Sequence, residues 1–373
     1  MPRGRQMMNT QTLSRRNFSK LIGVTAAYAA FRPDLATARP ATSNIVRLSA
    51  NENPYGPSPA ALKAMTDCFN LACRYPDEHA NLLADELARL HGVPMDQILL
   101  GDGSGEILKL SAAAFSGRDK KIVTANPTFE SIARHGSVAG ADVVKIDLTS
   151  DYSHDLKKML AAANGAGLVY ICNPNNPTAS ITPARELSDF LSKLSPATIV
   201  LVDEAYHHYV ESKDYESVIP LVKDYPNLMV ARTFSKVYGM AGLRCGYCVT
   251  QTGNIRQLRT HQAFDSVNIM ALVAALASLK DTDQVTRGRR LNSEVKKDVC
   301  AELDTLGYRY IPSHANFMMI DLRREVRPVI DGMRARRVEV GRVFPALPTF
   351  MRVTIGTAPE MKQFVSAFRE VMT

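Results

Sequence analysis

The 373-residue sequence has no apolar run of the roughly 20 residues that a membrane-spanning helix needs, so it predicts no stable membrane span. No repeat of solenoid period and no low-complexity tract is visible, which excludes a repeat architecture. Hydrophobic residues make up 46% of the chain and charged residues 22%, as is ordinary for a globular protein. The length exceeds that of one typical domain and indicates two, or one large and one small.

Cysteine is scarce and is not arranged for metal or disulfide chemistry. Cys245 and Cys248 have CxxC spacing, but they lie in an apolar run, Cys245 to Thr250, that predicts a strand. In a strand these two positions face opposite sides, which disfavours both a disulfide and a shared metal ion. There is no second CxxC and no spaced His pair, and the adjacent His207 and His208 are interpreted as structural. We expect no metal site and interpret all six cysteines as small core residues.

Residues 1–38 are expected to be a secretory signal. A basic stretch, Ser14 to Lys20, precedes an apolar stretch, Leu21 to Phe31, and the small residues Ala36 to Ala38. This is the order of a signal peptide, and Arg15 and Arg16 resemble the pair of a twin-arginine export signal. The alternative is a basic tail followed by a buried or anchoring helix. Twin-arginine export machinery would deliver the protein, already folded, to a periplasmic or secreted location.

Net charge argues against a nucleic-acid partner. The whole chain carries +8, and residues 1–38 hold six basic residues against one acidic residue, which leaves about +3 for residues 39–373. Most of the basicity therefore belongs to the predicted signal, and no nucleic-acid patch follows.

Short apolar runs alternate with helical patterns through the middle of the chain. The predicted strands are Ile98–Leu100, Lys121–Thr124, Asp142–Ile146, Leu168–Cys172, Thr198–Val202 and Leu228–Ala231. Such strands, separated by helices, indicate an α/β fold with a mostly parallel sheet covered on both faces. Helices are predicted from Ser58 through Cys68, with Ser58 as N-cap, and over Leu82–His91.

From about Thr286 the pattern changes to a long charged helix followed by two strands, Phe317–Ile320 and Met351–Ile355. This predicts a smaller α+β domain, completed by an N-terminal arm rich in Asn, Pro and Gly. We therefore predict a signal at residues 1–38, an arm at 39–60, a large domain at 61–280 and a small domain at 281–373.

Lys236 carries the strongest chemical signal in the sequence. It follows Ser235, two residues beyond Thr233, and Arg244 comes eight residues later. A lysine in this setting can hold an aldehyde as a Schiff base while the arginine binds the phosphate of the same molecule. This pattern predicts a pyridoxal phosphate site. A lone Ser-Lys pair is usually a surface feature, so the prediction needs the segments upstream.

Polar residues follow several predicted strands, where ligands of open α/β sheets bind. Asp203 ends an apolar strand, and a buried carboxylate there suits a pyridinium nitrogen, although a helix N-cap is the alternative. Asn176 and Tyr206 can reach a ring oxygen, whereas the Asn-Pro pairs around Asn176 also fit a plain turn. Gly101 to Glu106 opens a helix and can hold a phosphate on its amides, or be an ordinary turn.

Two further residues complete the set of candidates. Phe129 follows a strand and can stack on a cofactor ring, although a core position is nearly as common. Arg352 lies in the last predicted strand, and an arginine there pairs with the carboxylate or phosphate of a substrate, or forms an internal salt bridge.

Together these segments resemble class I/II, fold-type I pyridoxal-phosphate-dependent aminotransferases, most closely the histidinol-phosphate aminotransferase branch. The resemblance runs from about Arg47 to the C-terminus. It is also carried by the arm Asn51 to Gly56 and by Arg74-Tyr75-Pro76. It implies a large domain with a seven-stranded sheet, a smaller C-terminal domain and a homodimer with shared active sites.

The resemblance also implies a role for each candidate. Lys236 would attach the cofactor and move the proton at Cα, Asp203 would pair with the ring nitrogen, and Asn176 and Tyr206 would hold the ring oxygen. Phosphate ligands would be Gly103, Ser104, Thr233, Ser235 and Arg244, joined by Tyr75 of the neighbouring subunit, with Phe129 stacking on the ring. Arg352 would bind the acidic group of the substrate, and Asn53 and Tyr55 of the arm would lie beside the substrate. Gly105 stands where relatives have an acidic or polar residue, so one phosphate contact differs.

The function expected from these residues is transfer of an amino group between an amino acid, or an amino-phosphate, and a 2-oxo acid. A decarboxylase, lyase or oxidase would share Lys236 and Asp203 and stays an alternative, as does a cofactor-binding protein without turnover. Histidine synthesis is cytoplasmic, so the predicted export signal argues for a donor other than histidinol phosphate.

Overall fold

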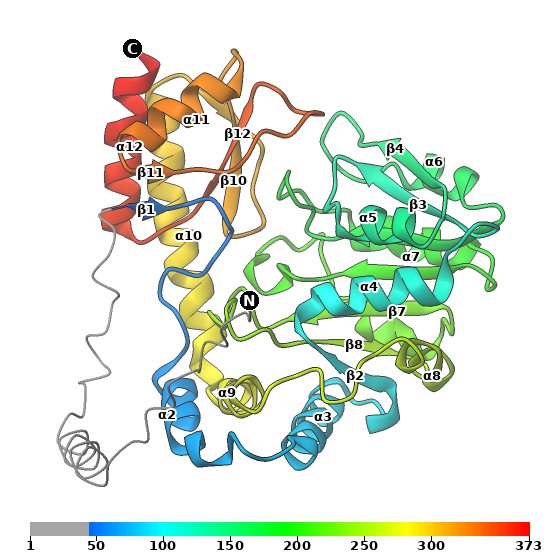
Figure 1. The fold of residues 1–373 in the computed structure, drawn as a ribbon. Helices are drawn as coiled ribbons and strands as arrows, with labels where there is room; N and C mark the ends of the chain where they lie inside the picture. Colours follow the sequence, from blue (N-terminus) through cyan, green and yellow to red (C-terminus); the bar gives the residue numbers. More distant parts are fainter. Residues whose placement is uncertain (1–44) are drawn as a thin grey trace, which may run out of the picture. The chain divides into compact units, whose positions relative to one another are not determined.

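A seven-stranded sheet forms the centre of the larger part of the computed structural model, which describes residues 45–373 (Figure 1). Its strands are β2 (Ile98–Gly101), β3 (Lys121–Asn126), β4 (Val143–Asp147), β5 (Ala166–Cys172), β6 (Ile199–Asp203), β7 (Leu228–Thr233) and β8 (Gly246–Thr250). Their order is β2-β8-β7-β6-β5-β3-β4, with β8 antiparallel to both neighbours and the other pairs parallel. The predicted, mostly parallel sheet is confirmed. The predicted signal, residues 1–38, lies outside the described residues.

Two hydrophobic cores cover the two faces of this sheet, because alternate residues of each strand point to opposite sides. In β5, Leu168 and Tyr170 belong to one core, and Val169 and Ile171 to the other. The first core includes helices α4 (Gly103–Phe115), α5 (Ser131–Val138) and α8 (Thr252–Arg259). The second includes α3 (Asp77–His91), α6 (Leu156–Ala162), α7 (Ala184–Lys193) and α9 (Ile269–Lys280).

Residues 46–48 and the part of the chain from α10 onward build a separate core around two small sheets. Strands β9 (Arg309–Tyr310), β10 (Phe317–Asp321) and β12 (Phe350–Thr354) form an antiparallel sheet in the order β12-β10-β9. Strand β1 (Val46–Arg47) pairs in parallel with β11 (Val338–Glu339), so the arm joins this part of the fold. Helices α10 (Thr282–Thr305), α11 (Val326–Ala335) and α12 (Ala358–Met372) pack beside these strands (Figure 1).

Helix boundaries follow the local capping chemistry. Helix α2 (Pro59–Asp67) begins after Ser58, whose hydroxyl accepts a hydrogen bond from the Ala61 amide at 3.2 Å, as predicted. Helix α3 begins at Asp77, five residues before the predicted start at Leu82. The acidic residues of its first turn stabilise the helix N-terminus although they contribute nothing to the apolar pattern.

The interpretation of all six cysteines as core residues is wrong for Cys73, which is exposed, and Cys300 is half-buried. A side chain in the short connection after η2 (Phe69–Leu71) has no core to enter. Cys245 and Cys248 belong to the two different cores of the sheet, as the strand prediction requires. Within residues 45–373, no group of His, Cys, Asp or Glu side chains is arranged to hold a metal ion. No helix of that range is long and apolar enough to span a bilayer.

Candidate active site

A cavity of about 320 Å³ lies where the carboxyl ends of β5, β6 and β7 meet the start of α4 and strand β12. It is lined by Ala50, Asn51, Ser104, Gly105, Phe129, Cys172, Asn176, Asp203, Ala205, Tyr206, Thr233, Ser235, Lys236, Ala241, Arg244 and Arg352. Most of the residues predicted for a cofactor site therefore line one cavity. They converge because the parallel strands all end at the same edge of the sheet.

Lys236 reaches this cavity from the segment after β7. Its Nζ donates a hydrogen bond to the backbone carbonyl of Asn51 at 3.2 Å and lies 5.3 Å from the centre of the Tyr206 ring. Burial, followed by the nearby Arg352 charge, lowers the pKa of Lys236 to about 8, although Asp203 acts in the opposite direction. A fraction of the amine is therefore neutral near pH 7, as a nucleophile or a base requires.

Asp203 is 2% exposed and has no cationic partner in an ion pair within the described chain. Its Oδ2 accepts from the Tyr170 hydroxyl at 2.9 Å and its Oδ1 from the Ala205 amide at 3.1 Å. Burial raises the pKa of Asp203 to about 6. The neighbouring Arg232 does not neutralise it, because that guanidinium pairs with Glu204 at 2.8 Å. The carboxylate is therefore available to a cationic group of a ligand in the cavity.

The alternative interpretation of Asp203 as a helix N-cap does not hold. Its Oδ1 accepts from the amide two residues on, which closes a tight turn. The next helical segment, η4 (His207–Tyr209), begins four residues later and has no side-chain cap.

The hydroxyl of Tyr206 is positioned to donate a hydrogen bond into the cavity. Its oxygen accepts from Asn51 Nδ2 at 3.0 Å and from Asn176 Nδ2 at 3.4 Å. Burial raises the pKa of Tyr206, so the phenol stays protonated. Because both amides occupy the oxygen as donors, the O–H hydrogen is left for an acceptor in the cavity. A ring oxygen of a cofactor is such an acceptor.

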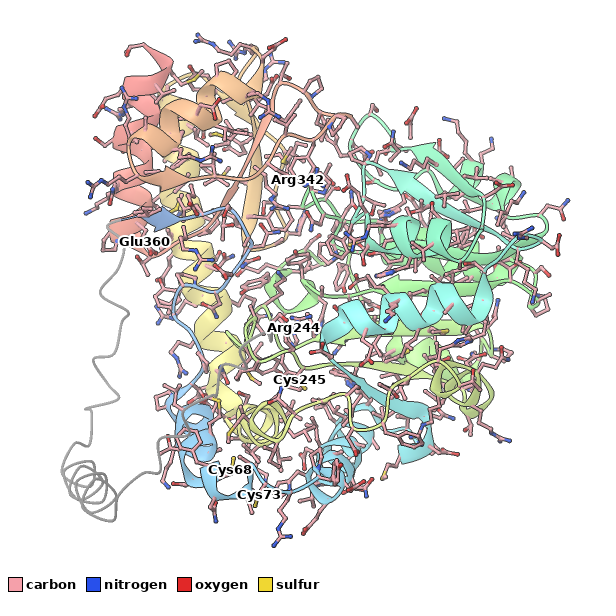
Figure 2. All side chains as sticks on the ribbon, in the orientation of Figure 1. Cys68, Cys73, Arg244, Cys245, Arg342 and Glu360 are labelled. Carbon is pink, nitrogen blue, oxygen red and sulfur yellow. The ribbon has the colours of Figure 1, made fainter. Side chains whose placement is uncertain are left out.

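Arg244, which is labelled in Figure 2, lies beside the start of α4, and together they form a group of hydrogen-bond donors that we call the cradle. Arg244 Nη1 donates to Ser235 Oγ at 3.3 Å, and Thr233 Oγ1 donates to the same oxygen at 2.9 Å. Gly103 has a φ of +71°, and a Cβ at this position would overlap the Arg244 guanidinium. The helix start, the two hydroxyls and the cation together fit a phosphate group.

Arg352 enters the cavity from β12. Its Nη1 donates to Asn176 Oδ1 at 2.8 Å and its Nη2 to the Ser49 carbonyl at 2.7 Å. Its buried Nε has no hydrogen-bond partner in the described part of the chain. The guanidinium lies 5.6 Å from the Phe317 ring and 5.2 Å from the Phe344 ring. Among residues 45–373 it forms no ion pair, so the alternative of an internal salt bridge is not found.

Four of the predicted residues do not line this cavity: Gly103, Asn53, Tyr55 and Tyr75. Phe129 lines the cavity and is 40% exposed. Gly103 lies under Arg244, outside the lining. Asn53 donates to the Val237 carbonyl at 2.8 Å and lines a separate cavity of about 260 Å³. Tyr55 and Tyr75 are 44% and 83% exposed. The structure of one chain thus brings neither tyrosine to the site.

Sequence reasoning missed two residues of the site. Tyr170, which donates a hydrogen bond to Asp203, was missed because it lies within an apolar strand. A single phenol two residues before the end of a buried strand does, however, indicate a hydrogen-bond partner nearby. Asn51 binds Tyr206 and Lys236, but within the arm the sequence analysis gave a role in the site only to Asn53 and Tyr55. No local pattern distinguishes one asparagine of this arm from the other.

Comparison with known proteins agrees with this site. The pattern of the family "Aminotransferase class I and II" matches residues 43–368, and the chain belongs to this family. Histidinol-phosphate aminotransferase of Moorella thermoacetica is 38% identical over 333 residues, which cover 88% of this chain and 86% of the relative. The structure of histidinol-phosphate aminotransferase from Sinorhizobium meliloti in complex with pyridoxal-5'-phosphate has a TM-score of 0.82 at 27% identity, covering 87% of this chain and 90% of the other.

The protein is therefore a pyridoxal-phosphate-dependent aminotransferase with the fold-type I architecture, as predicted. The cofactor fits the residues present, because Lys236, the buried Asp203 and the Gly103–Arg244 cradle suit its aldehyde, ring nitrogen and phosphate. L-threonine-O-3-phosphate decarboxylase from Porphyromonas gingivalis has a TM-score of 0.77 at 22% identity, covering 87% of this chain and 99% of the other. That likeness concerns the fold alone.

Proposed function

We propose that the amino donor is an amino acid or an amino-phosphate whose acidic group binds Arg352, and that the acceptor is a 2-oxo acid. The observation that carries this proposal is the Arg352 guanidinium, which has neutral hydrogen-bond partners, an unused Nε and no ion pair within residues 45–373. A guanidinium of this kind binds a carboxylate or phosphate through two parallel N–H bonds. Histidinol phosphate, named for the Moorella relative, is the first amino-phosphate to test.

When bound, pyridoxal phosphate carries the substrate amine covalently and accepts the electron density released at Cα. Lys236 is the residue that would attach the cofactor and then, as a neutral amine, take and return the proton at Cα. Asp203 would stabilise a proton on the ring nitrogen, and Tyr206 would donate to the ring oxygen. Arg244 and Ser235 would bind the phosphate, while Arg352 orients the substrate by its acidic group.

The test is an absorption spectrum of the purified holoenzyme before and after adding a panel of amino donors. A true donor converts the band of the lysine-bound cofactor to that of the amine form, and a 2-oxo acid returns it. Arg352→Gln should raise KM for acidic donors at least tenfold, while the free holoenzyme still shows a band of lysine-bound cofactor. Release of carbon dioxide, ammonia or peroxide without acceptor amination would instead assign a decarboxylase, lyase or oxidase.

The active site is further proposed to be shared between two copies of the chain. Tyr75 does not line the cavity of its own chain and is 83% exposed, and the apolar side chains of Leu62, Phe69 and Leu82 are exposed as well. Contiguous exposed apolar patches mark association surfaces, and we propose that this segment forms one. A second copy seated here could place its Tyr75 at the cradle formed by Arg244.

Mixed dimers test this arrangement. Chains carrying Tyr75→Ala or Lys236→Ala would be inactive or weakly active alone, whereas each mixed dimer would contain one intact site. Activity above either parent after co-expression is the expected result. Two monomeric variants, or a mixture no more active than its parents, would contradict the shared site.

Export by the twin-arginine route is proposed from the sequence of residues 1–38, with a periplasmic or secreted location as its consequence. Arg15→Lys together with Arg16→Lys should retain the protein inside the cell, as should a host without this pathway. Export also argues that the physiological donor is an amino acid or amine other than histidinol phosphate. Complementation of a histidine auxotroph by residues 39–373 would contradict that restriction on the donor.

A further inference from the structure

Among residues 45–60 of the arm, Asn51 forms the most hydrogen bonds. Its amide donates to Thr354 Oγ1 at 2.9 Å, and its side-chain Oδ1 accepts from the same hydroxyl at 3.3 Å. Its Nδ2 donates to the Tyr206 hydroxyl at 3.0 Å. Its carbonyl accepts from Lys236 Nζ at 3.2 Å and from Asn316 Nδ2 at 3.1 Å. All four polar atoms of this residue, which is 2% exposed, are therefore in use.

The backbone of Asn51 has a φ of +55°, in the left-handed region that side chains other than asparagine and aspartate rarely adopt. Such a conformation persists only where the surrounding contacts impose it. Here the left-handed turn lets the carbonyl reach Lys236 while the side-chain amide reaches Tyr206. One residue of the arm thereby contacts two groups that meet the cofactor.

Asn51 also connects these two groups to the strand that carries the substrate arginine. Thr354 lies two residues after Arg352 in β12, so both side chains point to the same face of that strand. Asn316, just before β10, fixes the Asn51 carbonyl and also donates to the Glu52 carbonyl at 3.2 Å. Movement of β12 or β10 would therefore shift Asn51.

We propose that Asn51 is a positioning residue that aims both Lys236 and Tyr206. Its carbonyl accepts an N–H of Lys236, so the lone pair of the neutral amine points away from the arm and into the cavity. Its Nδ2 occupies the Tyr206 oxygen, so the phenol hydrogen is directed to the cofactor. The inference rests on the transaminase chemistry of the site and is independent of which donor is used.

Two substitutions separate these effects from folding. Asn51→Gly keeps the left-handed backbone and removes the amide, because glycine adopts positive φ without strain. Asn51→Asp keeps the shape but replaces the N–H donor with an acceptor and adds a charge near Lys236. In both variants Tyr206 becomes a weaker donor to the ring oxygen, which favours protonation of the lysine-bound cofactor.

The readout is a pH titration of the absorption band of the holoenzyme, recorded without any donor. We expect the midpoint to rise by about one pH unit in Asn51→Gly and further in Asn51→Asp, since the interactions of one hydrogen bond correspond to shifts of this size. With an active donor, kcat should fall at least tenfold and KM change less than threefold. A midpoint within 0.2 units of the wild type, with kcat within about twofold, would overturn the proposal.

Two controls keep the test decisive. Arg337→Gly introduces glycine at a residue that also has positive φ, +60°, but is exposed, and should leave the midpoint unchanged. Thr354→Val removes only the hydroxyl that holds Asn51, and should move the midpoint in the same direction by a smaller amount. If Asn51→Gly fails to fold, an unchanged midpoint in Thr354→Val overturns the proposal. If the wild-type protein shows no band after reconstitution with pyridoxal phosphate, the result would instead contradict the cofactor assignment.

Discussion

At the scale of single residues, the site contains two charged groups that form no ion pair with any other side chain of residues 45–373. Asp203 is buried with only hydrogen-bond donors around it, and Arg352 has only neutral acceptors. Burial of an ionised group without a counter-charge is unfavourable, so such groups mark positions that a ligand completes. In the function proposed above, a cationic ring nitrogen would supply one of the missing charges and an acidic substrate the other.

The lowered pKa of Lys236 predicts how cofactor attachment depends on pH. Only the neutral amine attacks an aldehyde, and burial lowers the pKa of Lys236 to about 8. The rate at which the apoprotein attaches pyridoxal phosphate should therefore rise about tenfold per pH unit below pH 8 and level off above it. Stopped-flow absorbance over pH 6 to 10 measures this. A rate that still climbs tenfold between pH 9 and 10 would mean that the amine has an ordinary pKa.

Asp203→Asn should make the apoprotein more stable at neutral pH. Burial raises the pKa of Asp203 from 3.8 to about 6, so the folded state favours the protonated acid. The contribution of Asp203 to the free energy of unfolding is therefore fully present below pH 3.8. It is lost as the pH rises through 6, and the loss amounts to about 3 kcal/mol. The amide avoids that loss, so its advantage should be large at pH 8 and absent at pH 3.5. Urea unfolding of both apoproteins at several pH values tests this, and a pH-independent difference would refute it.

At the scale of elements, the junction between β2 and α4 shows why a glycine is required. Gly103 begins α4 with a positive φ, and the Arg244 guanidinium occupies the space of a side chain. The close approach brings the cation to the amides at the helix start. The buried pair of Arg232 and Glu204 secures a second junction, because Glu204 also accepts from the Val218 amide at 2.8 Å.

Gly103→Ala should weaken cofactor binding at least tenfold, because the new Cβ displaces Arg244 from the cradle. Gly92→Ala is the matched control, since Gly92 also has a positive φ, +64°, but nothing lies within 4 Å of its missing Cβ. Both variants should lose about 1 kcal/mol of stability from the backbone. Only Gly103→Ala should raise the Kd for pyridoxal phosphate, measured by fluorescence or absorbance titration. Equal Kd values for the two variants would contradict the cradle.

At the scale of the whole molecule, residues 45–373 join separate cores through shared polar contacts. The cavity takes residues from the large sheet and from β12, and Asn51 bonds to both. Arg342 and Glu130 form a further link at 2.7 Å, but both are exposed and contribute little; Figure 2 labels Arg342. The buried contacts at the cavity therefore couple the two parts more strongly than the surface pair does.

This coupling predicts one cooperative unfolding transition that pyridoxal phosphate moves as a whole. Cofactor at 100 times its Kd should stabilise the folded protein by about 2.7 kcal/mol. Calorimetry and near-ultraviolet circular dichroism should report the same Tm, and both should rise together. Two transitions, of which the cofactor moves only one, would show that the parts unfold independently.

Much of the fold was predictable because its signals are local. The apolar runs of β3, β5, β6 and β7 were recognised within a few residues, and Ser58 was recognised as an N-cap. The start of α3 was missed because charged residues at a helix N-terminus do not appear in an apolar pattern. Cys73 was assigned to the core because sequence does not show which connections reach it.

The sequence by itself determined the sheet, the lysine and arginine motif and the polar residues at the strand ends, since periodicity and turn chemistry act over a few residues. Only the tertiary structure decided that Tyr170 meets Asp203, because that contact depends on β5 lying beside β6 in the register that pairs Cys172 with Asp203. It also brought Asn51 to Thr354 across 303 residues of chain. Packing of distant segments sets such contacts, and no local pattern of side chains encodes them.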